Sequence, residues 1–152
     1  MTQRIHYSAV SPGGFKAMLQ LQTHVDNSGL EHSLLELVKM RVSQINRCAF
    51  CLDMHSKDAR AAGETEQRLY LLNAWHEAPC YSARERAALA WAEALTELPR
   101  NEVPDALYEE VRSQFSEQET VELSYAIIAI NGWNRLGVGF RTETGNYQPQ
   151  PR

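Results

Sequence analysis

The stretch SLLELVKMRVSQINRCAFCLDMHSKDARAAG, residues 33–63, indicates the fold class. Its first part carries apolar residues at the i, i+3, i+4, i+7 spacing of an amphipathic helix: Leu34, Leu35, Val38, Val42 and Ile45. We therefore predict a helix over about residues 31–45. Asn46 is a typical N-cap residue and Gly63 a typical C′ residue, so the second part predicts another helix over about residues 47–62.

The rest of the chain predicts five further helices and no strand, over about residues 12–27, 65–76, 82–98, 104–115 and 116–137. Ser82 with Glu85, and Ser116 with Glu119, have the spacing of capping boxes. The last helix carries LSYAIIAI, residues 123–130, which is apolar on nearly all sides and indicates a central position or an oligomer interface. The expected fold is an all-α, single-domain bundle of about seven helices.

The composition is that of an ordinary soluble domain. The chain has 152 residues, a net charge of −4 and no Lys/Arg cluster, so no nucleic-acid partner is expected, although a basic patch assembled only by folding stays open. The longest apolar run, residues 125–130, is too short for a membrane span, and the N-terminus lacks a signal-peptide pattern. We expect a cytoplasmic protein with one domain over residues 1–141 and a loosely ordered polar tail over residues 142–152.

The motif CAFCLDMH, residues 48–55, carries the candidate chemistry. On a helix Cys48, Cys51 and His55 share one face, and Cα atoms at i, i+3 are about 5 Å apart, which a disulfide accepts. A helix N-terminus lowers a thiol pKa, a neighbouring imidazole can accept the thiol proton, and a second cysteine can resolve a sulfenic acid. A close cysteine pair in a reducing compartment is typical of catalysis or metal binding rather than of a structural staple.

Other interpretations of the motif stay open at this point. Two core thiols at i, i+3 can pack without chemistry, and a zinc ion can bind a CxxC pair. Zinc sites usually take that pair from a tight turn and complete it with a second pair, which this chain lacks, so we expect no metal. We also expect no organic cofactor, because the chain has no Gly-rich phosphate loop.

The remaining candidate residues are interpreted as structural. We expect packing or surface roles for Cys80, His24, His76, Trp75, Trp91, Trp133, Asn134 and Arg135. Asp53 is expected to face solvent.

Glu36, Cys48, Cys51 and His55 stand as E-x11-C-x2-C-x3-H. This resembles the signature of the alkylhydroperoxidase AhpD-like proteins of the carboxymuconolactone decarboxylase superfamily, and the resemblance extends over roughly residues 15–138. It implies an all-α fold, trimers or hexamers, and an antioxidant thiol peroxidase that reduces hydroperoxides with electrons from an external dithiol, a dihydrolipoyl- or thioredoxin-like protein. It also implies that the two cysteines cycle between dithiol and disulfide, that His55 accepts a proton, and that Glu36 orients or feeds His55.

Two features depart from simple expectation. Phe50 stands where the best-studied AhpD-type enzymes have a histidine, so one proton carrier is missing. Periodicity alone places Glu36 opposite the apolar stripe of its helix, in solvent, whereas the resemblance implies burial, a raised pKa unless the carboxyl is paired, and proton exchange with His55.

The order of attack and the function class are also open. The helix start favours Cys48 as the attacking thiol, and contact with His55 favours Cys51. The alternatives to a peroxidase are a redox sensor or disulfide-exchange protein, and a lactone-acid lyase, whose branch typically lacks the cysteine pair.

Overall fold

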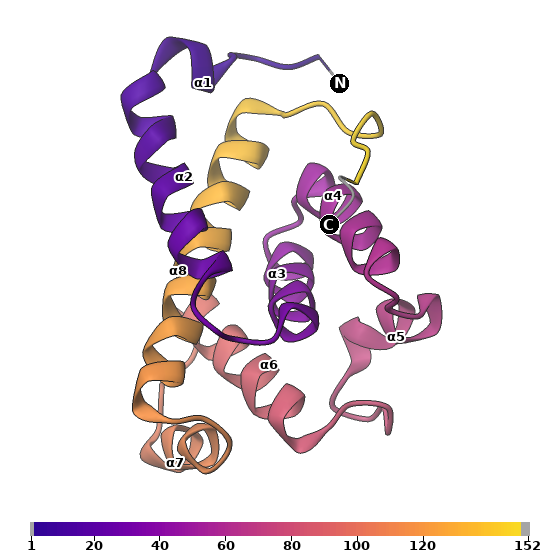
Figure 1. The fold of residues 1–152 in the computed structure, drawn as a ribbon, viewed down its shortest axis with the longest axis vertical. Coiled ribbons are helices and arrows are strands. Elements are labelled where there is room, and N and C mark those ends of the chain that lie inside the picture. The colour runs from indigo at the N-terminus through magenta and orange to yellow at the C-terminus, as the bar shows by residue number, and fades with distance from the viewer. Residues whose placement is uncertain (1, 150–152) are drawn as a thin grey trace.

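Two helices organise the molecule, a central α3 and a long α8 that runs beside it (Figure 1). The computed structural model describes residues 2–149, which contain eight α-helices and one 3-10 helix. Their bounds are α1 Tyr7–Val10, α2 Pro12–Asp26, α3 His32–Ile45, α4 Ala49–Ala61, α5 Glu66–Leu71, a 3-10 helix Leu72–Ala74, α6 Ala83–Thr96, α7 Asp105–Gln114 and α8 Glu117–Phe140. The predicted all-α, single-domain bundle is confirmed, with the short α1 as an unpredicted addition.

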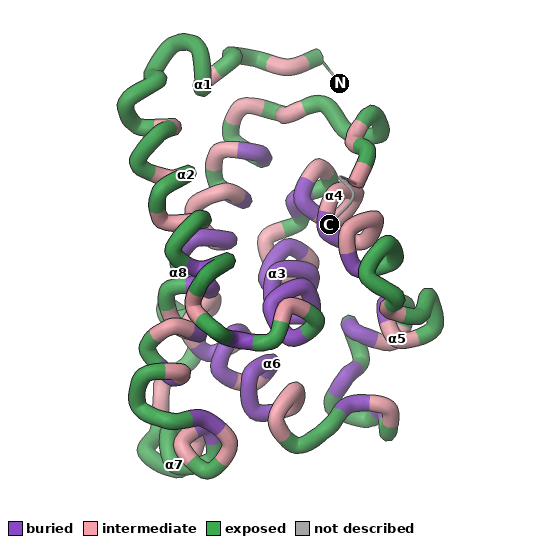
Figure 2. The backbone as a smooth tube through the Cα atoms, viewed as in Figure 1, coloured by how far each residue is buried: buried purple, intermediate pink, exposed green. Residues whose placement is uncertain are grey.

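Helix α3 is buried along most of its length (Figure 2). It packs against α4, α6 and α8, so neighbours cover more than its apolar stripe. Its buried residues include Leu35, Val38 and Val42 of the predicted stripe, but also Glu36 and Lys39. The periodicity argument placed Glu36 in solvent because it assumed one covered face; that expectation is wrong, and Glu36 is 2% exposed.

Several helix ends lie where the sequence predicts them. Both capping boxes form: each serine hydroxyl accepts from the backbone N–H three residues on, and each glutamate accepts from the serine N–H. Gly63 follows the C-cap of α4 with φ 96°, a left-handed conformation that a residue with a Cβ rarely adopts.

The start of α4 differs from the prediction. Asn46 is the C-cap of α3 rather than an N-cap, and its side-chain amide donates to Asn131 and Asn134 of α8. Arg47 follows in a left-handed conformation, and Cys48 is the N-cap of α4. The helix therefore begins at Ala49, two residues later than predicted, because the Asn46 side chain bonds to α8 instead of to the next turn.

Residues 142–149 follow α8 and pass over α4 (Figure 1). The Tyr147 hydroxyl donates to Asp58, and the Lys57 ammonium donates to the carbonyl of Tyr147. The carboxylate of Asp53 accepts from Lys57 and from the Gly145 N–H, so Asp53 is half-buried rather than facing solvent as expected. A loosely ordered tail stays a prediction, and residues 150–152 lie outside the described part.

None of the helices in residues 2–149 is both long and apolar enough to cross a membrane.

Candidate redox site

Cys48 and Cys51 form a disulfide at the start of α4, with their Cα atoms 5.3 Å apart. Cys48 Sγ also accepts a hydrogen bond from the Cys51 N–H at 3.3 Å, so one sulfur both caps the helix and closes the bond. The predicted side-by-side placement of the two sulfurs is therefore confirmed. The positive end of the α4 dipole favours negative charge here, which lowers the cost of forming a thiolate when the bond opens.

Gly137 of α8 lies directly against this disulfide. A Cβ at position 137 would lie 2.9 Å from Cys48 Sγ and 3.6 Å from Cys51 Sγ, and the first distance is shorter than Cβ atoms show to neighbouring atoms in proteins. The absent side chain is what allows the longest helix of the fold to approach the sulfurs. Sequence reasoning did not single out Gly137, because nothing in its local pattern signals a contact made across the fold.

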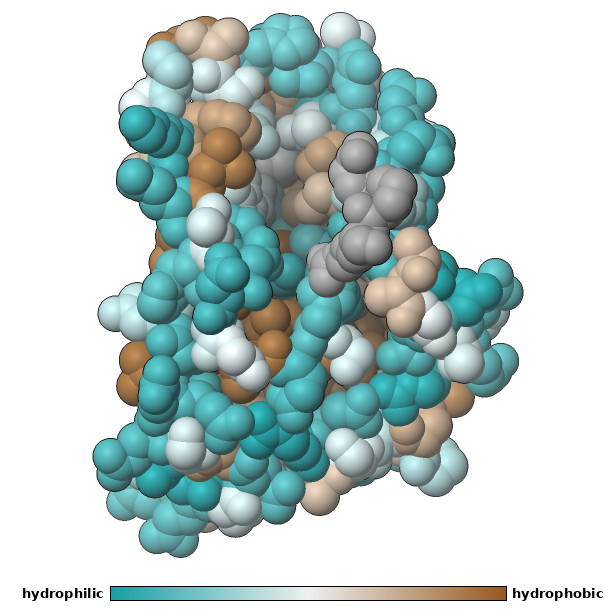
Figure 3. Space-filling model, viewed as in Figure 1, coloured by the Kyte–Doolittle hydropathy of each residue, from teal (hydrophilic) through white to brown (hydrophobic). Residues whose placement is uncertain are grey.

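A cavity of about 370 Å³ lies beside the disulfide, between α2, α3, α4 and α8. The face shown in Figure 3 is hollowed between α2 and α4, with apolar side chains in the hollow. The apolar lining consists of Tyr7, Phe15, Leu19, Phe50, Met54 and Trp133. The polar lining consists of Gln22, Asp26, Glu36, Lys39, His55 and Asp58, together with the sulfur-bearing Cys51. Cys51 thus borders the cavity, whereas Cys48 does not take part in the lining.

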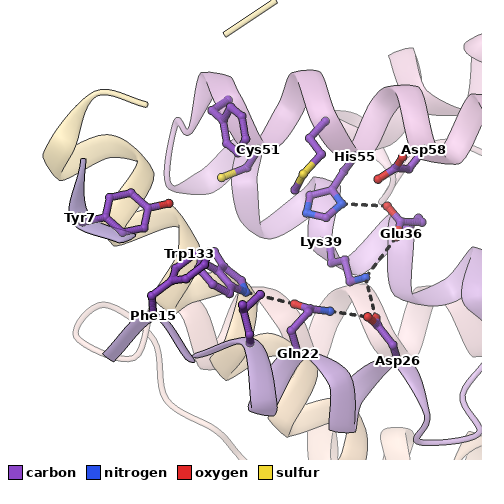
Figure 4. Close-up of a pocket in the computed structure, with 13 residues that line it drawn as sticks. Tyr7, Phe15, Gln22, Asp26, Glu36, Lys39, Cys51, His55, Asp58 and Trp133 are labelled. Atoms are coloured by element: carbon purple, nitrogen blue, oxygen red, sulfur yellow. Dashed lines mark hydrogen bonds and ion pairs between the residues drawn. The ribbon is translucent and has the colours of Figure 1, made fainter. Parts of the chain in front are cut away.

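His55 lies between Cys51 and Glu36 in the close-up of the cavity (Figure 4). Its Nδ1 is 2.9 Å from Glu36 Oε2, and both side chains are buried. An ionised carboxylate can only accept, so Nδ1 carries the hydrogen and Nε2 is left as the basic nitrogen. This is the arrangement in which His55 can take a proton from a thiol in the cavity.

Glu36 is surrounded by positive or donating groups. The Lys39 ammonium lies 3.1 Å from Glu36 Oε1, and the ring of His32 approaches the same oxygen at 3.3 Å. Burial alone would raise the pKa of Glu36, but the hydrogen bonds and charges of His55 and Lys39 outweigh burial and lower the pKa to about 2. Glu36 is therefore a carboxylate at neutral pH. Glu36 is therefore suited to act as a fixed hydrogen-bond acceptor that orients the His55 ring, rather than as a group with a raised pKa that exchanges protons with His55.

Lys39 extends this network to α2 and α8 (Figure 4). Its ammonium is 3.5 Å from Asp26, which accepts from Gln22, and Gln22 in turn accepts from the Trp133 indole N–H. Sequence reasoning missed Lys39, although its i, i+3 spacing from Glu36 was a usable signal. Trp133 packs against the core as expected, and it also lines the cavity.

Most of the other singled-out residues have structural partners. His24 pairs with Glu122, and His76 pairs with Glu93. Trp75 and Trp91 are buried in the core, Cys80 is a free, half-buried thiol, and Asn134 donates to Ser43.

Glu36, His55 and Asp58 place ligand atoms within 4.8 Å of one another, a spacing that a metal ion could use. Both oxygens of Glu36 already accept, one from Lys39 and the other from His55, so a cation there would displace an ammonium. The two sulfurs are bonded to each other. These contacts favour an acid–base and thiol site over a metal centre.

Comparison with known proteins identifies a family and several relatives. Residues 12–94 match the carboxymuconolactone decarboxylase family. The uncharacterised protein YdfG of Bacillus subtilis is 46% identical over 138 residues, which cover 91% of this chain and 94% of YdfG. A crystal structure from Agrobacterium tumefaciens, of a protein of unknown function provisionally named antioxidant defence protein AhpD, superposes with TM-score 0.92 at 44% identity, covering 96% of this chain and 100% of the other.

A more distant likeness shows the fold alone. An uncharacterised peroxidase-related protein of Ralstonia eutropha, described as an alkylhydroperoxidase AhpD core, superposes with TM-score 0.80 at 19% identity, over 91% of this chain and 74% of the other. This chain, with its Cys48–Cys51 pair at the start of α4, belongs to the carboxymuconolactone decarboxylase family and is AhpD-like in fold.

Proposed function

We propose that the protein is a thiol peroxidase that reduces organic hydroperoxides through a Cys48–Cys51 dithiol–disulfide cycle. One observation carries the proposal: a sulfur of the Cys48–Cys51 disulfide, that of Cys51, borders the same cavity as a histidine whose Nδ1 is held by a buried carboxylate. The near relative provisionally named an antioxidant defence protein supports it.

Cys51 is the attacking thiol in this proposal, because it lines the cavity and lies one helical turn before His55. His55 Nε2 takes the Cys51 proton, and the thiolate attacks the terminal peroxide oxygen, which breaks the O–O bond. The sulfur becomes a sulfenic acid, and the proton on His55 passes to the leaving alkoxide to give an alcohol. Cys48 then attacks the Cys51 sulfur, water leaves, and the disulfide forms.

The cavity favours an uncharged substrate with an apolar group. Its aromatic wall can hold an alkyl or aryl substituent, and its one ammonium, Lys39, is already paired with Glu36 and Asp26. Phe50 contributes apolar surface at the position where the best-studied AhpD-type enzymes have a histidine, so proton transfer in this proposal depends on His55 alone.

The test measures consumption of cumene hydroperoxide with a dithiol supply, for wild type, Cys48→Ser, Cys51→Ser and the matched control Cys80→Ser. Both site variants should lose turnover, and the control should keep it. After one peroxide addition, Cys48→Ser should retain a trappable sulfenic acid, whereas Cys51→Ser should give none. Sulfenic acid only in Cys51→Ser would assign the attack to Cys48.

Redox sensing is the rival interpretation, since the same sulfurs could change oxidation state without turning over. The assay separates the two: a sensor consumes one equivalent of peroxide per disulfide even when reductant is in excess, whereas a peroxidase consumes many. A lactone-acid lyase would keep its activity in both site variants.

Self-association into trimers or hexamers belongs to the same proposal. Helix α8 exposes an apolar stripe at i, i+4, i+7 spacing, made of Val121, Tyr125 and Ile128. Light scattering on wild type and Ile128→Glu should show a higher-order species that the variant reduces toward the monomer; a monomeric wild type would remove assembly from the proposal.

A further inference from the structure

The hydroxyl of Tyr7 is a polar group of the cavity beside the disulfide that the proposed cycle does not use. The Tyr7 ring belongs to the apolar wall of that cavity, and Figure 4 shows the hydroxyl at the end of the ring pointing into the space that the Cys51 sulfur also faces. Tyr7 is half-buried, and its hydroxyl makes no hydrogen bond to any residue between 2 and 149. Its O–H is therefore free to donate to a substrate.

The other polar side chains of this cavity already have partners. Each has a hydrogen bond or an ion pair within residues 2–149: Gln22, Asp26, Glu36, Lys39, His55, Asp58 and Trp133. The Nε2 of His55 serves the Cys51 proton in the proposed cycle, and Phe50 beside Cys51 contributes no donor. Within the described part of the chain, Tyr7 is thus the polar residue of the lining whose donor has no existing partner.

Contacts with two helices hold the Tyr7 ring at the cavity. Its centroid lies 6.1 Å from that of Phe15 on α2 and 5.7 Å from that of Phe140 at the end of α8. The chain before Tyr7 is tied to the same end of α8, because Arg4 donates its backbone N–H to the Phe140 carbonyl at 2.9 Å and its guanidinium to the Gly139 carbonyl at 3.0 Å. None of these contacts involves the hydroxyl, so the ring can keep its place when the hydroxyl is removed.

The breaking of a peroxide bond produces a charge that such a donor can stabilise. When the Cys51 thiolate attacks the terminal oxygen, the O–O bond breaks and negative charge gathers on the oxygen that carries the organic group. A hydrogen-bond donor already in place at that oxygen stabilises the transition state more than the bound peroxide, because the charge develops only as the bond breaks. The donor therefore accelerates the cleavage.

We propose that Tyr7 is a catalytic residue whose hydroxyl donates a hydrogen bond to the leaving oxygen of the hydroperoxide. The inference rests on the proposed function and adds one group to it. The Cys51 thiolate takes up the terminal OH and becomes a sulfenic acid, the electron pair of the O–O bond stays on the organic oxygen, and the proton on His55 converts that oxygen to an alcohol. Tyr7 keeps its own proton throughout.

The experiment compares two peroxides that both carry a phenyl group and differ in the basicity of the leaving oxygen. Reduced full-length wild type and Tyr7→Phe are mixed with each peroxide without reductant, and the loss of the free Cys51 thiol is followed by quenching, alkylation and mass spectrometry. With cumene hydroperoxide, which releases a strongly basic alkoxide, Tyr7→Phe should react roughly 10-fold to 100-fold more slowly than wild type. With perbenzoic acid, which releases the weakly basic benzoate, the loss should stay under about threefold.

Tyr108→Phe is the matched control. Tyr108 is 46% exposed on α7, at the other end of the molecule from α1 (Figure 1), and its hydroxyl also makes no hydrogen bond within residues 2–149. This variant should react with both peroxides at the wild-type rates, and circular dichroism should show the same helix content in all three proteins.

Two outcomes would remove Tyr7 from the chemistry and leave the proposed function standing. One is a Tyr7→Phe variant that reacts with both peroxides as fast as wild type. The other is an equal loss with both peroxides, which would indicate that the hydroxyl only supports the shape of the cavity. If wild type itself reacts with neither peroxide faster than free cysteine does, the proposed function fails, and this inference fails with it.

Discussion

Two glutamates of this protein accept hydrogen bonds from similar sets of side chains but lie in different surroundings. Glu36 of α3 accepts from His55 and Lys39, while Glu93 of α6 accepts from Trp75 and Arg41 at 2.7 Å each and from His76 at 3.2 Å. In both, burial would raise the carboxyl pKa and the donors lower it instead.

The difference lies in the histidine. His55 is buried and borders a cavity that also holds a sulfur, whereas the His76 side chain is 65% exposed and stacks on Trp75. A depressed carboxyl pKa beside a histidine therefore does not identify a site by itself. The cavity and Cys51 separate the functional pair from the structural one.

The largest effect is expected from Glu36→Gln. The amide keeps the shape but loses the charge that fixes the His55 tautomer, so peroxidase turnover should fall roughly 100-fold, the lower range for a positioned acid–base group. Circular dichroism should show an unchanged helix content. Unchanged turnover would indicate that Glu36, like Glu93, has only a structural role.

Glu93→Gln should give the converse result. The carboxylate accepts from three side chains, and weakening these bonds should lower the free energy of unfolding by about 1–3 kcal/mol. Turnover should stay within about twofold of wild type. Urea denaturation followed by tryptophan fluorescence measures the first quantity, and a large loss of turnover in a folded variant would erase the distinction between the two glutamates.

Lys39→Met tests how Glu36 is kept ionised. With its pKa at about 2, Glu36 is a carboxylate throughout pH 4–8 in wild type. Without the Lys39 charge this pKa rises, the carboxyl protonates at higher pH, and the acid limb of turnover should move upward in pH. We expect the loss of turnover to be larger at pH 5 than at pH 8, where it should stay under about twofold. Lys16→Met, on the exposed face of α2, is the control; a uniform loss across pH would instead indicate a purely structural role.

The smallest effect is expected from His76→Ala. Its contact with Glu93 is solvent-exposed, so the free energy of unfolding should fall by less than about 1 kcal/mol, with full turnover. Thermal unfolding measures the stability and peroxide consumption measures the turnover, with His55→Ala, which should lose turnover, as the contrast. Inactivation by His76→Ala would indicate that the chemistry involves Glu93 rather than Glu36.

Local signals predicted the parts of the fold that are decided locally. The capping serines, Gly63 and the i, i+3 cysteines depend on backbone geometry within a few residues, and the structure has them as expected. Asn46 was misassigned because its amide bonds across the fold to α8. The burial of Glu36 was expected from the resemblance and not from periodicity, because the periodicity of one helix does not show which other helices enclose it.

The contact of Lys39 with Asp26 and the contact of Gly137 with the sulfurs could not be predicted from the sequence for the same reason. Each contact joins segments that only the fold brings together, α3 with α2 in the first case and α8 with the start of α4 in the second.

Gly137 carries a consequence for the redox cycle. Two unbonded sulfurs lie farther apart than two bonded ones, and the space left by the missing Cβ of Gly137 can accommodate that separation. We therefore expect helix α8 to stay in place while the pair opens and closes, and we expect a methyl added at position 137 to be tolerated least by the reduced state.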